Sequence, residues 1–246
     1  MDAAQTIRHC IAEVSALRAA RAGNPALATA VGQIKALQVQ RFRGTYDDLM
    51  RSPAFAPAAG FFLKELYGNS DYTERDLQFG RIAGTLQTVF PAPVVATAVA
   101  LAELHAQTEA LDQAMGNAWL AMPEGASEAA RYASAWRATG QRDARQRQLQ
   151  RVLAMGKDLA RLTRMPGMRT MLRMMRGPAN AADLGALQRF LEAGFDTFGQ
   201  LARQRGAVEQ FLATVAERER ALMDQLFDAD PVACETMLAR TLGQAR

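Results

Sequence analysis

Apolar residues recur along this chain at intervals of three and four positions. In the first segment, Ile7, Ile11, Val14 and Leu17 share one face of an expected helix over residues 2–22. The same spacing returns in nearly every later segment, and no run alternates as a strand would. β-Branched and aromatic residues, which favour strands, are sparse. The pattern therefore predicts an all-α, multi-helix bundle of about ten helices.

Short local signals predict where these helices begin and end. Asn24-Pro25 offers a cap followed by proline at the first helical position, and Ser52-Pro53 repeats the arrangement. Asp71 to Glu74 resembles a capping box, and Gly68 before it is a natural terminator. Further boundaries are expected at Pro91, Gly140, Met165–Gly167, Gly177-Pro178 and Asp230-Pro231.

The chain is expected to form a single helical domain over residues 1–246, with one weak candidate boundary at residues 122–127. No stretch reaches the roughly 18 uninterrupted apolar residues of a membrane span, and no signal peptide is evident. The two cysteines, Cys10 and Cys234, are too few for a disulfide framework. These features favour a cytoplasmic protein.

The net charge of +4 is strongly segregated along the chain. The segment 131–176, called the basic segment below, holds twelve basic and two acidic residues and balances to +10, whereas the flanks 1–130 and 177–246 balance to −3 each. This segregation predicts a non-enzymatic protein that binds a macromolecular partner through the basic segment, with an anionic partner as one candidate. The candidate partner-binding residues are Arg142, Arg145, Arg147, Arg151, Arg164, Arg169, Arg173 and Arg176.

The kind of partner is open. A protein partner or a second copy of the chain is expected first. Nucleic acid and an anionic membrane surface are weaker alternatives, since Tyr132 and Trp136 are the only aromatic residues of the basic segment. Its methionines suit adaptable recognition, but a methionine stripe is equally typical of core packing. The arginines also fit a solvated face paired with the acidic flanks.

His105, Glu109 and Asp112 share one face of a predicted helix, because they stand at i, i+4 and i+7. A nitrogen and two carboxylates on one face are a candidate metal-ligand set, although Glu103 lies nearly opposite. The alternative is a histidine hydrogen-bonded to a neighbouring carboxylate at the edge of the core. We expect no metal site and no cofactor.

A second polar group consists of Tyr72, Arg75, Asp76 and Arg81. Arg75 and Asp76 are adjacent and point in different directions on a helix, so each needs its own partner. They either tie the preceding turn to the helix through buried ion pairs or line a ligand pocket, where buried charges concentrate.

Motifs typical of enzymes are absent: the sequence has no phosphate-binding glycine loop, Gly-x-Ser-x-Gly, His-Glu-x-x-His or Cys-x-x-Cys. No catalytic residue is therefore assigned. The alternative to the partner-binding hypothesis is a small-ligand-binding protein or metal-assisted enzyme with a pocket between helices near Arg75, Asp76, His105 and Glu109.

The segment FFLKELYGNSDYTERDLQFGRI, from Phe61 to Ile82, resembles a recurring segment of a group of uncharacterised bacterial helical proteins. The chain departs from that pattern at Asn69 and Tyr72. Three later stretches, ELHAQTEALD, RYASAWRATGQRDARQRQL and LQRFLEAGFDTF, are also similar, so the resemblance runs from about residue 35 onward. It implies one continuous helical domain and no known activity. The matching positions are Phe61, Phe62, Leu66, Tyr67, Gly68, Arg75 and Asp76.

Overall fold

The structure, a computed structural model, describes residues 1–66, 71–123 and 125–243. Every regular element within these ranges is a helix and none is a strand, which confirms the expected all-α fold. Tyr67, Gly68 and Asn69 of the family resemblance lie outside the described residues, and so does the helix end predicted at Gly68.

The helices follow one another through short connections. They are α1 (Ala3–Ala22), α2 (Pro25–Thr45), α3 (Asp47–Arg51), α4 (Ala56–Phe61), the π-helical turn η1 (Phe62–Leu66), α5 (Thr73–Val89), α6 (Ala92–Leu120), α7 (Glu128–Thr139), α8 (Arg142–Thr163), α9 (Met168–Met174), α10 (Arg176–Ala181), α11 (Gly185–Ala202), α12 (Ala207–Asp228) and α13 (Pro231–Gly243).

Several predicted helix boundaries are confirmed. The side chain of Asn24 accepts a hydrogen bond from the backbone N–H of Leu27, with Pro25 at the first position of α2. Gly140 ends α7 in the left-handed conformation at φ 61°, which a residue without Cβ adopts without strain. The side chain of Asp230 caps the start of α13.

One predicted helix start and one predicted helix cap are wrong. Ser52 belongs to the end of α3, where its N–H donates to the carbonyl of Asp48, and the next helix begins only at Ala56. The capping box at Asp71 to Glu74 does not form. Instead Asp71 accepts a hydrogen bond from the N–H of Thr73, two residues on, and α5 begins at Thr73 without a side-chain cap.

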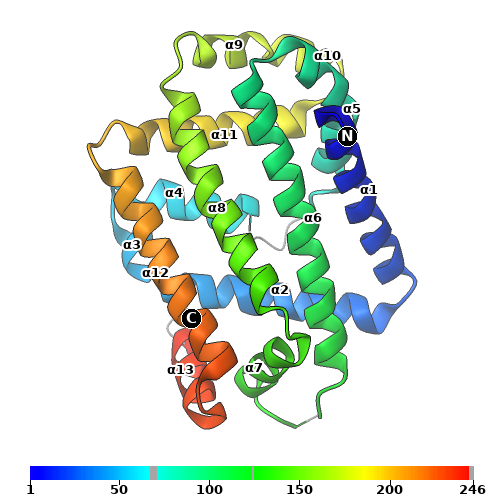
Figure 1. The fold of residues 1–246 in the computed structure, drawn as a ribbon, viewed down its shortest axis with the longest axis vertical. Coiled ribbons are helices and arrows are strands. Elements are labelled where there is room, and N and C mark those ends of the chain that lie inside the picture. Colours follow the sequence, from blue (N-terminus) through cyan, green and yellow to red (C-terminus); the bar gives the residue numbers. More distant parts are fainter. Residues whose placement is uncertain (67–70, 124, 244–246) are drawn as a thin grey trace.

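Some helices run along the long axis of the protein, and others cross them (Figure 1). The helices α6, α8 and α12 run along the long axis of the protein, and α2 and α11 cross them at different heights. The short helices α9 and α10 cover one end, and α7 and α13 close the other. The stripe of Ile7, Ile11 and Val14 is buried, and its helix α1 packs on α5 and α6. Crossing helices leave enclosed space between them, and the candidate site occupies such a space.

Aromatic side chains fix η1 against the rest of the core. The Phe61 ring lies 5.9 Å from the Phe190 ring of α11, and the Phe62 ring lies 5.5 Å from the Phe211 ring of α12, measured between centroids. Aromatic contacts of this kind add packing energy beyond burial alone. Phe61 and Phe62 thus anchor the turn that carries Glu65.

Gly116 allows α2 and α6 to approach closely. A Cβ at this position would lie 2.5 Å from Cγ2 of Val31, far inside van der Waals contact. The close crossing directs the next turns of α2, with Lys35 and Gln38, toward the face of α6 that carries Glu109 and Asp112.

None of the helices in the described ranges combines the length and the apolar character needed to cross a membrane.

Candidate functional site

A cavity of about 40 Å³ lies between α2, η1, α5, α6, α8 and α11. We call it the polar cavity. It is large enough for about three water molecules by the usual volume criterion. The structure brings to it all four residues around which the sequence placed a ligand pocket: Arg75, Asp76, His105 and Glu109. The polar side chains in its wall are Lys35, Gln38, Glu65, Tyr72, Arg75, Asp76, His105, Thr108, Glu109, Asp112 and Gln148.

Four of the residues that hold this site together were missed by the sequence analysis. Arg18 and Arg21 continue the buried stripe of α1, and Lys35 and Gln38 continue that of α2. A detectable signal was present, since each polar residue falls at the three- or four-residue spacing of an otherwise apolar face. Such a residue points into the protein rather than to solvent.

Glu109 is held by two cations from different helices. Its Oε2 lies 2.6 Å from Nη2 of Arg21, and its Oε1 lies 2.5 Å from Nζ of Lys35. Burial alone would raise the pKa of this carboxyl, but Lys35 and Arg21 outweigh it and lower the pKa to about 2. Glu109 is therefore a fixed negative charge whose two oxygens are both occupied.

Asp76 is the second fixed carboxylate. Its Oδ2 lies 2.6 Å from Nη2 of Arg18 and 2.7 Å from Nε2 of His105. Burial favours the neutral acid, but the hydrogen bond to His105, together with the charge of Arg75 and the hydrogen bond from Arg18, lowers the pKa of Asp76 below its ordinary value. His105 is thus hydrogen-bonded to a carboxylate, which is one of the two alternatives given in the sequence analysis. The carboxylate, however, belongs to Asp76 on another helix, α5.

Asp112 behaves differently, although it stands one turn after Glu109 on the same face. Its Oδ1 accepts a hydrogen bond of 3.0 Å from Gln38, and its nearest cation, Lys35, is 3.9 Å away. Burial dominates here and raises the pKa of Asp112 above its ordinary value, because Lys35, Arg145 and Gln38 compensate only in part.

Arg75 is the least tightly held cation of the polar cavity. Its guanidinium lies between two aromatic rings, 4.1 Å from the Tyr72 centroid and 4.6 Å from the Phe190 centroid. It donates one hydrogen bond of 3.3 Å to the carbonyl of Glu65. The nearest carboxylate oxygens, from Glu65 and Asp76, are 3.5 and 3.6 Å away, about 1 Å further than those that hold Arg18 and Arg21.

The π-helical turn η1 supplies Glu65 to this wall. Turns of this kind are rare and occur frequently at functional sites. Arg81, by contrast, lies outside the polar cavity: it is exposed and donates to the carbonyl of Asp183 at 2.7 Å.

The trio on α6 does not converge on one point. His105 faces Asp76, Glu109 faces Arg21 and Lys35, and Asp112 faces Gln38. Within the described part of the chain, no three His, Cys, Asp or Glu side chains are arranged to hold a metal ion.

Several arginines of the basic segment are engaged within the chain. Arg142 lies 2.7 Å from Asp224 and 2.6 Å from Asp228 of α12. Arg145 is buried, with its guanidinium 4.3 Å from the Trp136 ring. Three more arginines pair with acidic residues outside the segment: Arg151 with Glu103, Arg169 with Asp196 and Arg176 with Glu192.

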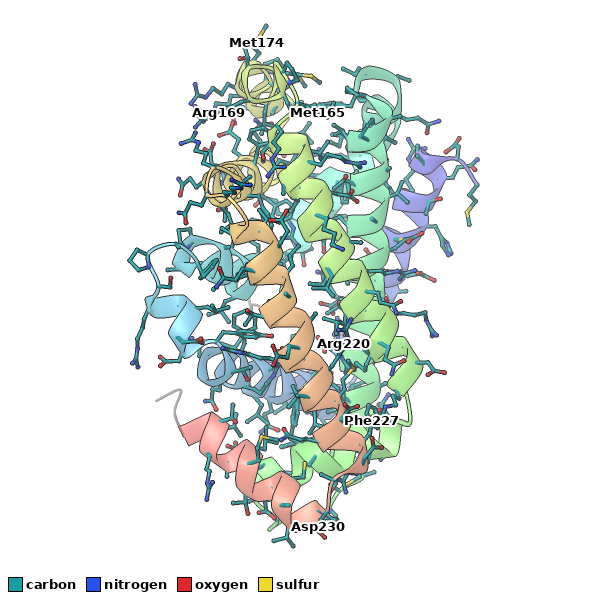
Figure 2. All side chains as sticks on the ribbon, turned by 60° about the vertical axis from the view of Figure 1, so that its left-hand side comes forward. Met165, Arg169, Met174, Arg220, Phe227 and Asp230 are labelled. Atoms are coloured by element: carbon teal, nitrogen blue, oxygen red, sulfur yellow. The ribbon has the colours of Figure 1, made fainter. Side chains whose placement is uncertain are left out.

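Other cations of the segment face solvent. Arg147, Arg164 and Arg173 are exposed and form no ion pair with any residue that the structure describes. Arg164 also borders a groove between α8 and α12, which we call the α8–α12 groove and which Lys157 and Arg220 line as well. Figure 2 labels Arg220 on α12, the helix that forms one side of this groove.

The methionines of the segment divide between core and surface. Met168 is buried and, with Leu172, lines a second cavity of about 110 Å³ whose walls come from α4, α5, α6, α8, α9 and α11. Met174, at the outer end of α9, is 73% exposed and points away from the protein in Figure 2. We call the cavity lined by Met168 and Leu172 the apolar cavity, because Thr97 is the only polar side chain among the described residues in its wall.

Comparison with known proteins gives one match. A family model described as a domain of unknown function (DUF8198) matches residues 17–233. No curated protein and no solved structure matches the chain. The matched range includes every residue named above for the polar cavity.

Proposed function

The chain belongs to the DUF8198 family, whose function is unknown, and we propose that it binds a small molecule in the polar cavity. The observation that carries this proposal is the concentration of charged side chains around one cavity. Buried ion pairs rarely stabilise a fold more than apolar residues of similar size would. Charged groups gathered in a cavity are instead typical of binding sites.

The arrangement also separates fixed groups from a less constrained one. Arg18, Arg21 and Lys35 hold their carboxylates at 2.5 to 2.6 Å and form a rigid frame. Arg75 is oriented by two rings, and its nearest carboxylate oxygens among the described residues, from Glu65 and Asp76, lie 3.5 and 3.6 Å away. A preorganised donor of this kind fits a ligand that supplies the missing acceptor.

A ligand screen by thermal unfolding tests the proposal. Ligands that bind only the folded protein raise its melting temperature. The screen uses small polar and charged molecules on the wild type and on the variants Arg75→Gln and Arg81→Gln. We expect ligands that stabilise the wild type and Arg81→Gln but not Arg75→Gln. The matched control is informative because both arginines lie on α5 and only Arg75 borders the polar cavity.

Two results would contradict the proposal. One is a screen in which no small molecule raises the melting temperature. The other is a set of ligands whose effect survives Arg75→Gln unchanged, which places them elsewhere on the protein.

A second candidate function is the binding of an acidic protein surface at the α8–α12 groove. Its support is that Lys157, Arg164 and Arg220 line one groove without an ion pair to any described residue. A row of cations of this kind favours a partner with complementary charge. This candidate keeps Lys157 and Arg164 from the partner hypothesis for the basic segment and adds Arg220 of α12.

We also propose that the protein acts in a bacterial cytoplasm and that the Phe61 to Asp76 motif marks its family. The support for the compartment is that Cys10 and Cys234 are both unpaired and buried. Fractionation of cells of the source organism tests it, with the protein expected in the cytoplasmic fraction and not in exported or membrane fractions.

A further inference from the structure

The polar cavity and the apolar cavity adjoin each other. Four side chains, Phe79, Leu101, Leu187 and Phe190, line both spaces. A single layer of side chains therefore separates a charged compartment from an apolar one. One molecule that reaches both would have a polar end and an apolar end.

The apolar cavity sets the size of the apolar end. Its volume is about 110 Å³. An engineered apolar cavity of about 150 Å³ in another protein takes up benzene. The apolar cavity therefore suits a short alkyl chain or a group no larger than a benzene ring.

The charges of the polar cavity set the sign of the polar end. Lys35 and Arg75 line the polar cavity together with the carboxylates Glu65, Asp76, Glu109 and Asp112. Two further cations, Arg18 and Arg21, lie outside its wall and pair with Asp76 and Glu109. Asp76 and Glu109 are held by cations at 2.5 to 2.6 Å. Arg75 has no carboxylate oxygen closer than 3.5 Å among the described residues, so its guanidinium favours an anion.

Arg75 presents that positive charge at the boundary between the two cavities. Its guanidinium lies over the ring of Phe190, one of the four shared side chains. A guanidinium forms two parallel hydrogen bonds with a carboxylate, which an ammonium group cannot do. Glu65, the carboxylate closest to Arg75, is 30% exposed and so has solvent into which it can withdraw.

We infer that the ligand is a small monocarboxylic acid with a short apolar body, bound with its carboxylate at Arg75 and its hydrocarbon in the apolar cavity. Binding in this way displaces side chains of the shared layer between the two cavities. This inference rests on the proposed function and names its ligand class.

A matched series of probes tests the inference by calorimetric titration of the full-length protein. Hexanoate carries both features. Hexanamide removes the charge, hexylamine reverses it, and acetate removes the hydrocarbon. We expect hexanoate to bind about tenfold or more tightly than each of the other three, since a hydrogen bond to a charged group and a buried alkyl chain each contribute that much.

Variants separate the two ends of the ligand. Arg75→Gln should weaken hexanoate about tenfold or more and remove its preference over hexanamide. Arg81→Gln should leave both the affinity for hexanoate and its preference over hexanamide unchanged. Ala98→Leu fills part of the apolar cavity and should weaken hexanoate without affecting acetate. Ala96→Leu, at an exposed position two residues earlier on α6, is its control.

The outcomes distinguish this inference from the proposed function. Equal binding of hexanoate and hexanamide, or tighter binding of hexylamine, would overturn the carboxylate assignment. Acetate as strong as hexanoate would overturn the apolar body. If other small molecules bind in an Arg75-dependent way while hexanoate does not, the inference fails and the proposed function stands. If no probe and no screened molecule binds, both fail.

Discussion

Arg21 and Glu109 are 88 residues apart in the sequence, and their side chains meet inside the protein at 2.6 Å. Both are buried, and Lys35 contacts the other oxygen of the same carboxylate at 2.5 Å. The contact joins α1, α2 and α6 at the wall of the polar cavity. Asp112, one turn later on α6, has its nearest cation 3.9 Å away. The two carboxylates should therefore contribute differently to stability.

Glu109→Gln should destabilise the protein strongly, whereas Asp112→Asn should not. The first change leaves two cations near the core without their carboxylate, and breaking a buried ion pair costs about 3–5 kcal/mol. The second removes a carboxylate whose pKa burial raises, so the free energy of unfolding should stay within about 1 kcal/mol of the wild type or exceed it. Urea unfolding at pH 7 measures both. Equal losses in the two variants would contradict the contrast.

The same carboxylate predicts a pH dependence. The pKa of Glu109 is lowered from an ordinary 4.5 to about 2 in the folded protein. Its stabilising contribution is therefore fully present above about pH 4.5 and is lost as the pH falls toward 2. The stability difference between the wild type and Glu109→Gln should shrink by about 1.4 kcal/mol per pH unit in that window. A difference that stays constant down to pH 3 would refute the assignment.

The crossing of α2 and α6 predicts opposite effects for two glycine substitutions. Gly116→Ala places a Cβ 2.5 Å from Cγ2 of Val31, and overpacking of this kind costs about 1–3 kcal/mol. Gly32→Ala, in α2, meets no atom within 4 Å and should stabilise the helix by about 0.5–1 kcal/mol. Thermal unfolding of both variants is the measurement. Stabilisation by Gly116→Ala would show that the helices can move apart.

The α8–α12 groove predicts a difference between exposed and paired cations. Replacing Lys157, Arg164 and Arg220 by Gln should move elution from a heparin column to clearly lower salt, because these charges face solvent. Replacing Arg142, Arg169 and Arg176 by Gln removes the same charge but should shift elution less, since acidic neighbours already neutralise them. Equal shifts would argue against a localised binding groove.

A single helical domain predicts one cooperative unfolding transition. Circular dichroism should show a dominantly helical spectrum, and the helical signal should be lost in the same step as the fluorescence of Trp119 and Trp136, which are both buried. Two separable transitions would instead place a domain boundary in the chain, with residues 122–127 as the first position to examine.

Local periodicity was sufficient to predict the helices and the faces they bury. The stripe of Ile7, Ile11 and Val14 is buried as its spacing required. His105, Glu109 and Asp112 share the face of α6 that borders the polar cavity. These features depend on residues within a few turns of one another, so they can be read from neighbours in the sequence. The errors at Ser52 and Asp71 arose where short capping signals support a turn as readily as a helix.

The tertiary structure decided which of these faces meet. The sequence grouped Arg75, Asp76, His105 and Glu109 around one pocket only as an alternative hypothesis, and it could not show which helices pack together to form the cavity. It counted the charge of the basic segment but not the acidic residues of α12 that lie against Arg142. Ion pairs between distant segments depend on how helices cross, and crossings are set by close packing such as that at Gly116 rather than by local pattern.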